Sequence, residues 1–524
     1  MKKLIKFAMV GLLLVMAACT DLDLEPQSTT TAAVLFNDES SYRSFLARIY
    51  AGIAITGQQG PAGNADISSL DEGFSNYLRQ YWQLQELPTE EAVIGWGDEG
   101  IQDLHNHVWT SANQFVRATY YRIFFQVSQA NEFLRETTDA KLSERNVSQS
   151  TRNDIKAYRA EARFLRALSL WHGIDMFGDI PFYTEDTPIG SEPPAQASRS
   201  EVFNFIDSEL KTIENDMIAA GQNEYGRADR AALWMLQAKL YLNAQVYAGV
   251  NRYTDCITAC KKIIDSGVYS LEDEYQHLFL ADNDRTNEVI FAIPFDGLNT
   301  QTWGGTTYLV HAPVGGTMDP ANWGINGGWF GLRTTAAFVD LFTDVTGDTD
   351  ERALFYTDGQ TKEINSISNF GDGYALPKYS NVTSEGVGGA DLNHPDTDFP
   401  MFRLADAYLM YAEAVLRGGQ GGDVNVAVNL INQLRQRAYN DATGNITAGD
   451  LTLDFILDER ARELYWEGHR RTDLIRYDRF TDNGIWPWKG GVKEGKLTES
   501  FRDLYPIPAS EILANPKLTQ NDGY

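Results

Sequence analysis

Apolar residues recur every three to four positions in several long stretches of the chain, which is the period of a helix with one buried face. Similar stripes run through 155–177, 228–248 and 403–417, and the last of these ends at Gly418-Gly419, a C-cap signal. In the first stretch the repeating positions are Ile155, Tyr158, Ala162, Leu165 and Leu168. The pattern therefore predicts a mostly α-helical fold.

The predicted helices follow one another in short-linked pairs. Such pairs are typical of tetratricopeptide-like stacking, in which each pair buries its apolar stripe against the next. The pairs are 155–177 with 201–220, 228–248 with 253–266, and 403–417 with 424–438, and a further pair comes from 41–55 and 114–136. We expect a helical-pair scaffold over about 35–290 and 400–475.

Residues 290–400 differ in kind from the predicted scaffold. They are rich in Gly, Asn, Asp and Thr, with short extended runs such as "EVIFAIPF". Long irregular segments inside a compact domain are usually functional. We expect a loop-rich ligand-binding insertion here and an ordered tail over 476–524, all within one large domain formed by 19–524.

The N-terminus has the form of a secretory signal over residues 1–18, with three early lysines followed by the apolar run 7–18. That run is shorter than the roughly 20 residues a membrane-spanning helix needs. The motif Met-Ala-Ala-Cys, which ends at Cys19, resembles a bacterial lipobox, so lipidation of Cys19 is predicted. The alternative is an ordinary secretory signal with an incidental cysteine.

The amino-acid composition limits which molecules the chain is expected to bind. The 524 residues carry a formal net charge of −28, which repels phosphate backbones and argues against nucleic acid. Aromatic residues make up 12% of the chain, which suits both a helical core and sugar-stacking surfaces. Cys256 and Cys260 lie one helical turn apart, and we interpret them as small buried residues rather than as a disulfide or metal site.

Three segments carry a family resemblance when they are taken together. They are "RALSLWHGIDMFGDIPFY", "DERARELYWEGHRRTDLIRY" and "LYPIPASEILANPKLTQNDGY". By itself each indicates only local structure: a helix end, a solvent-exposed charged helix, and an ordered tail. In the charged helix Glu459, Arg460, Glu463 and Glu467 have the spacing of helical pairs.

In this order, and behind a lipobox, these segments resemble the SusD/RagB family of Bacteroidetes surface lipoproteins that serve nutrient uptake. The resemblance covers the mature chain and implies a tetratricopeptide scaffold with a loop-rich ligand-binding half. It also implies anchoring to the outer membrane and a SusC-like TonB-dependent transporter as partner, over which the protein sits as a hinged lid. Members of the family bind different glycans, and some bind peptides.

The stretch 79–101 holds the first candidate binding residues. Trp96 lies between Gly95 and Gly97, and glycine neighbours let a ring stand clear of its backbone. Arg79 and Trp96 match the Arg and Trp of the glycan site in the starch-binding branch of the family, which suggests an α-glucan ligand. The branch's Asn after that Trp is absent, and Asp98 and Glu99 occupy the region.

A second supply of aromatic residues lies in the glycine-rich stretch 299–335. Trp303, Tyr308, Trp323 and Trp329 have no helical or strand period there, so we expect loops to present them as a wall against ligand. The other interpretation is that these rings contact the partner transporter.

An enzyme is the main alternative class of function. Glycoside hydrolysis needs two carboxylates across a cleft, and no pair stands out among the 72 acidic residues. His105 and His107 have a spacing that some metal sites use, but no third ligand is implied. Nucleophile-elbow, P-loop and dinucleotide motifs are missing from the sequence. We therefore expect a protein that binds its ligand without catalysis and without a cofactor or metal. A protein-scaffolding tetratricopeptide module is the other alternative function.

Overall fold

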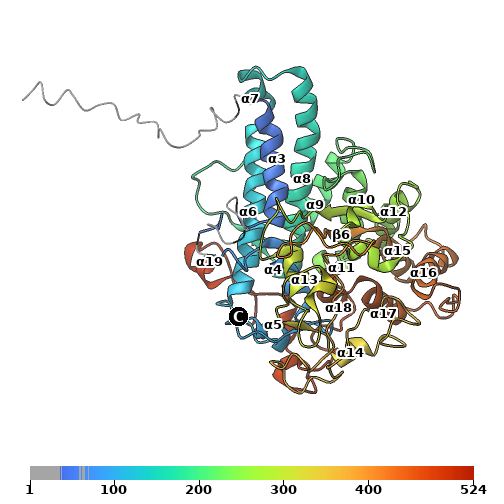
Figure 1. Cartoon of the computed structure of the whole chain (residues 1–524). Coiled ribbons are helices and arrows are strands. Elements are labelled where there is room, and N and C mark those ends of the chain that lie inside the picture. Colours follow the sequence, from blue (N-terminus) through green and yellow to red (C-terminus); the bar gives the residue numbers. More distant parts are fainter. Residues whose placement is uncertain (1–35, 37, 58–60, 62–64, 69) are drawn as a thin grey trace, which may run out of the picture.

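A computed structural model describes residues 36, 38–57, 61, 65–68 and 70–524. Helices dominate this part of the chain, as predicted (Figure 1). Those of the first half are α3 (Ser40–Ala54), α4 (Tyr77–Glu86), α5 (Gln102–Asn106), α6 (Gln114–Glu136), α7 (Asp139–Glu144), α8 (Gln149–Phe177) and α9 (Arg199–Ile213). They continue with α10 (Arg230–Leu242), α11 (Ala244–Ala248), α12 (Tyr253–Ile264), α15 (Leu404–Leu416), α16 (Val424–Tyr439), α17 (Leu453–Leu464), α18 (Arg470–Arg476) and α19 (Ala509–Ala514).

The predicted helix pairs pack together in the structure. Helix α8 packs against α9, α10 against α12, and α15 against α16. Helices α3 and α6 contact each other, and both contact α8, which makes the upright bundle at the top of Figure 1. Side-chain caps start two of these helices: Asn113 accepts from the backbone of α6, and Ser148 from that of α8.

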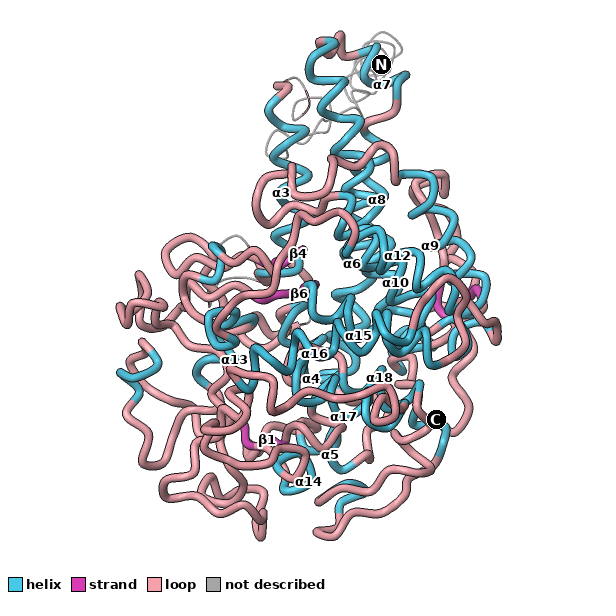
Figure 2. The backbone as a smooth tube through the Cα atoms, turned by 90° about the vertical axis from the view of Figure 1, so that its right-hand side faces the viewer, coloured by secondary structure: helices cyan, strands magenta, loops and turns pink. Residues whose placement is uncertain are grey.

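The insertion between β4 and β6 has little regular structure. Figure 2 shows its loops gathered to one side of and below the helices. In the described residues the strands form two-stranded antiparallel sheets: β1 (Val93–Ile94) with β5 (Leu332–Arg333), β2 (Ile180–Pro181) with β3 (Gln196–Ala197), and β4 (Val289–Ile293) with β6 (Phe399–Arg403). Within the insertion lie the short helices α13 (Gly305–His311) and α14 (Ala336–Val339) and the 3-10 turn η3 (Pro320–Trp323). The 3-10 turns η1 (Tyr275–Phe279) and η2 (Asn283–Arg285) precede it, and η4 (Lys489–Gly491) and η5 (Ser500–Asp503) belong to the C-terminal tail. Because β4 pairs with β6, both ends of the insertion return to the same place on the scaffold.

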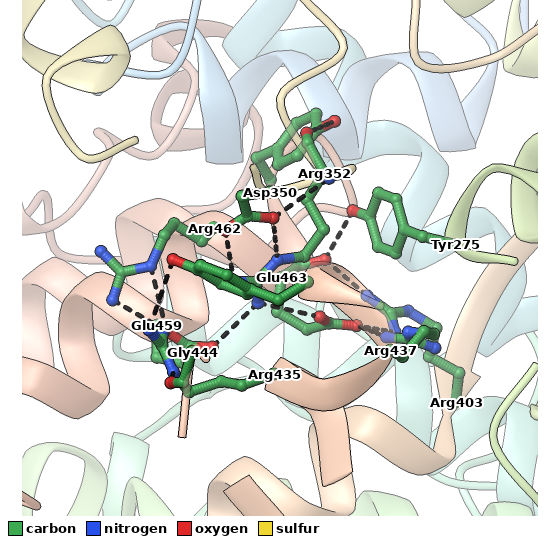
Figure 3. Close-up of polar contacts among 12 residues, drawn as sticks. Tyr275, Asp350, Arg352, Arg403, Arg435, Arg437, Gly444, Glu459, Arg462 and Glu463 are labelled. Carbon is green, nitrogen blue, oxygen red and sulfur yellow. Dashed lines mark hydrogen bonds and ion pairs between the residues drawn. The ribbon is translucent and has the colours of Figure 1, made fainter. Parts of the chain in front are cut away.

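The prediction of one solvent-exposed charged helix over the segment "DERARELYWEGHRRTDLIRY" is wrong. The segment forms two helices, α17 and α18, separated by a turn in which Trp466 and Gly468 have positive φ. Its charged residues are buried, and Figure 3 shows how they are neutralised. Glu459 accepts from Arg352 at 2.9 Å, and Glu463 accepts from Arg403 at 2.7 Å.

Burial of Glu463 by itself raises the pKa of its carboxyl. The neighbouring guanidinium groups of Arg437, Arg403 and Arg352 outweigh that effect and lower the pKa to about 2. These arginines come from α16, β6 and the insertion, so the buried ion pairs attach the insertion to the scaffold. Helical spacing suggested partners within one helix. Arg462 does pair with Glu459 inside α17 at 2.8 Å, but the other partners of Glu459 and those of Glu463 come from distant segments.

Three further expectations concern the cysteines, membrane-spanning helices and the N-terminus. Cys256 and Cys260 are buried free thiols on α12, as predicted. None of the helices in the described ranges is long and apolar enough to cross a membrane. The predicted signal peptide and Cys19 lie outside the described residues.

Candidate functional site

Arg79 lies at the centre of the predicted binding residues. It stands in the first turn of α4, where the Asn76 side chain accepts from its backbone N–H at 2.9 Å. Its guanidinium carbon lies 4.5 Å from the ring centroid of Tyr308 and 5.7 Å from that of Trp96. Nη1 donates to the carbonyl oxygen of Trp303 at 3.1 Å. The structure thus brings together residues that are far apart in sequence.

The charge of Arg79 is buried without a partner of opposite charge. The residue is 9% exposed, and no carboxylate of the described chain lies within ion-pair distance of it. Its Nε has no hydrogen-bond partner there. Burial lowers the pKa of the guanidinium, while Tyr308, Asp98 and Asp71 raise it. Removing a charge from water without an ion-pair partner costs several kcal/mol, roughly, so the buried charge of Arg79 is an energetic cost to the fold.

The rings beside Arg79 form a connected row, which we call the aromatic cluster: Trp96, Trp303, Tyr308 and Trp329. Trp96 is half-buried and lies 6.1 Å from Trp329, to whose carbonyl oxygen its Nε1 donates at 2.9 Å. Trp303 lies 6.2 Å from Trp329. At Gly331 a Cβ would lie 2.6 Å from the Trp96 ring, so a glycine is required for this approach.

Tyr308 does not line an exposed wall, as the sequence suggested. It is 0% exposed and stands on α13, which begins after Gly304. A helix of seven residues is too short to show a periodic pattern, which is why the segment looked like a loop. Tyr308 instead packs beneath Arg79 and supports it.

The remaining predicted residues divide into two groups. Asp98 and Glu99 are exposed in the loop after Trp96, where the Gln114 side chain donates to the carbonyl oxygen of Glu99 at 2.7 Å. Trp323 lies apart from the aromatic cluster, in η3, and its nearest ring partner is Tyr356 at 6.0 Å.

Sequence analysis missed two histidines that back the cluster. His311 stacks on Trp329 with ring centroids 4.9 Å apart, and His394 lies 4.8 Å from Trp303. Single histidines in irregular segments carry no pattern that could have identified them. Phe330 is also missed; it is 53% exposed, and its position beside Trp329 was the available signal.

The two histidines considered as metal ligands are core residues. Burial lowers the pKa of both His105 and His107 to about 3, so both rings are neutral at pH 7. Nε2 of His107 lies 2.7 Å from the carbonyl oxygen of Pro88. In the described part of the chain no three His, Cys, Asp or Glu side chains are grouped as metal ligands.

Comparison with known sequences places this chain in a family. The chain is 35% identical to the starch-binding protein SusD of Bacteroides thetaiotaomicron over 577 aligned positions, which cover 100% of this chain and 99% of that protein. The chain belongs to the SusD family. The family model matches residues 343–524. The SusD-like protein P25 of Formosa agariphila is 27% identical over 72% of this chain and 73% of its own length.

Solved structures of SusD proteins have the same fold. A SusD superfamily protein from Parabacteroides distasonis superposes with a TM-score of 0.72 at 21% identity, covering 93% of this chain and 99% of the other. Surface glycan-binding protein A of Bacteroides thetaiotaomicron, solved in complex with laminarihexaose, superposes with a TM-score of 0.68 at 18% identity, covering 92% and 99%. The predicted family and helical fold are confirmed.

Proposed function

We propose that this SusD-family protein binds a neutral oligosaccharide, of the α-glucan type, at Arg79 and the aromatic cluster. The observation that carries the proposal is the buried, unpaired guanidinium of Arg79 held between Trp96 and Tyr308. A cation without a carboxylate partner suits a ligand that offers hydroxyl oxygens. The 35% identical relative is named as a starch-binding protein, which favours an α-glucan.

The aromatic and the polar residues of the site have different roles in sugar recognition. Sugars in water already have good hydrogen bonds, so exchanging those for protein hydrogen bonds is nearly neutral in free energy. The gain comes largely from covering the apolar C–H faces of the sugar rings with flat aromatic side chains. Half-buried Trp96, Trp303 and Trp329 supply such faces. Arg79 donates to hydroxyls, and exposed Asp98 and Glu99 accept from them.

Membership of the SusD family supports a proposal for the protein's role in uptake. We propose that it is anchored to the outer membrane through lipidated Cys19 and delivers its ligand to a SusC-like TonB-dependent transporter, as the lid of that channel. We propose binding without hydrolysis: Asp98 and Glu99 come from one loop, whereas a glycoside hydrolase needs carboxylates on both sides of the scissile bond. A non-α-glucan polysaccharide or a peptide as ligand remains the rival.

Two variants of half-buried tryptophans test the binding site. Trp96→Ala removes a ring of the aromatic cluster, and Trp323→Ala removes a ring outside it. One stacking platform contributes roughly 1–3 kcal/mol, so Trp96→Ala should weaken binding about tenfold to a hundredfold. Trp323→Ala should bind like the wild type.

The measurement is affinity electrophoresis of the purified proteins in gels cast with starch, laminarin or no polysaccharide, followed by calorimetry with maltoheptaose. Melting temperatures of both variants control for folding. Wild-type affinity in a folded Trp96→Ala protein would remove the proposed site, and retardation by laminarin alone would replace the α-glucan with a β-glucan.

A further inference from the structure

A hollow lies outside the aromatic cluster. Its volume is about 400 Å³, within the range of small-molecule sites. One face of α3, the turn 224–227, the end of β4 and the loop residues 299–300 line it. Tyr225 from the turn and Tyr50 from α3 both contribute rings to this hollow, which we call the Tyr225 pocket.

Tyr225 is unusual because its ring is open to solvent while its hydroxyl is fixed. The residue is 49% exposed, yet the hydroxyl donates to Oδ2 of Asp398 at 2.5 Å. Asp398 is 4% exposed, and its Oδ1 accepts the backbone N–H of Phe295 at 2.6 Å. Gly226 has φ of 75°, and a Cβ there would lie 2.9 Å from Pro294, so the turn sits close against β4. The aromatic face is therefore held in place before any ligand arrives, which lowers the entropy lost on binding.

The charged side chains that line the pocket, Arg43, Glu224 and Arg227, are all held in ion pairs, Arg227 with Glu161 at 2.5 Å. Arg43 and Glu224 form an ion pair at 2.6 Å across the mouth, with side chains 61% and 54% exposed. Asn299 and Thr300 add an amide and a hydroxyl. The floor is apolar, formed by residues such as Leu46 and Ile293. An apolar floor with a fixed aromatic face and a polar rim whose charges are paired matches a sugar ring better than it matches an ion.

We propose that the Tyr225 pocket is a second saccharide-binding subsite, with Tyr225 stacked on one sugar ring. This inference rests on the proposed function. The pocket and the aromatic cluster share a loop: Thr300 lines the pocket, and three residues later Trp303 accepts from Arg79. Three residues span at most about 11 Å, so the two sites lie at neighbouring ends of one short segment. A polysaccharide that occupies both gains avidity over one that occupies a single site.

The test compares a polymer with a short ligand. Tyr225→Ala should weaken retardation by soluble starch roughly tenfold, while maltotriose, too short to need both sites, should bind the variant as it binds the wild type. In a Trp96→Ala background, residual starch binding should disappear when Tyr225→Ala is added. Tyr121→Ala, which removes a partly exposed ring on α6, is the matched control.

The outcomes separate the two proposals. Unchanged starch affinity in a folded Tyr225→Ala protein, with Trp96→Ala defective, would overturn the second subsite and leave the first intact. A wild-type protein that binds no saccharide would overturn both. If Tyr225→Ala melts early, Tyr225→Phe replaces it. The ring remains but its hydroxyl bond to buried Asp398 is lost, so the melting temperature and the starch affinity should both lie between those of the wild type and the alanine variant.

Discussion

Replacing two buried arginines by methionine should affect the protein in opposite ways. Arg79→Met and Arg403→Met both remove a guanidinium from a buried site and keep a long, flexible side chain. Arg79 has no ion-pair partner among the described residues. Arg403 pairs with Glu288 at 2.8 Å and with Glu463 and Glu467 at 2.7 Å. The comparison therefore separates a cation reserved for ligand from one that maintains the fold.

For Arg403→Met the cost is structural. The change leaves three buried carboxylates with fewer cations, and breaking a buried ion pair costs about 3–5 kcal/mol of unfolding free energy. The remaining neighbours Arg352, Arg437 and Lys378 relieve part of that charge. We expect a marked loss of stability and low yield of folded protein.

For Arg79→Met the favourable and unfavourable changes in the free energy of unfolding nearly cancel. The variant loses hydrogen bonds to two carbonyl oxygens, each worth about 1.5–3 kcal/mol for a charged donor, and a ring contact worth about 0.5–2 kcal/mol. It also no longer buries an unpaired charge, and this stabilises the folded state by several kcal/mol, roughly. Stability should stay within about 2 kcal/mol of the wild type. Ligand affinity should fall about tenfold to a hundredfold, because one charge-assisted hydrogen bond to the ligand is lost.

The assay measures chemical unfolding and maltoheptaose calorimetry on the same preparations. If Arg79→Met lost as much stability as Arg403→Met, Arg79 would be a structural cation and the argument for its ligand role would fail. Full ligand affinity in a stable Arg79→Met protein would refute the role directly.

Three further predictions follow from other parts of the molecule. In the Cys19→Ala variant the protein should be lost from the membrane fraction, and proteases added to whole cells should no longer find it on the cell surface. A variant that stays attached would contradict lipid anchoring. Incubation with maltoheptaose should leave its length unchanged by chromatography, and shorter products lost on mutating one Asp or Glu would indicate a hydrolase. Burial raises the pKa of the Glu86 carboxyl from 4.5 to about 7, and burial together with the neighbouring Glu86 raises the pKa of the Glu91 carboxyl well above 4.5. At these two carboxyls the folded protein binds more protons than the unfolded chain between about pH 4.5 and pH 7, so their contribution to stability should decline as pH rises through this window. Glu91→Gln, whose amide donates to Glu86 without titrating, should reduce the decline between unfolding curves at pH 5 and pH 8.

The sequence pattern was a good guide to the helices and a partial guide to the site. Apolar stripes marked the helix pairs because burial of one face imposes a period on the sequence itself. Trp96 and Arg79 were recognised through the family resemblance and the glycines beside Trp96. Tyr308 was misassigned because its helix is too short to carry a period, and His311 and His394 left no local signal at all.

The sequence by itself determined where the long helices lie, how they pair, and which family the chain resembles, because these depend on neighbours along the chain. Only the tertiary structure decided which charges are buried. Glu463 has the local pattern of a surface helix, but Arg403 and Arg437 arrive from β6 and α16 to neutralise it. In the same way Asp398 meets Tyr225 across 173 residues. Contacts between distant segments depend on how the whole chain packs, and no period along the sequence encodes them.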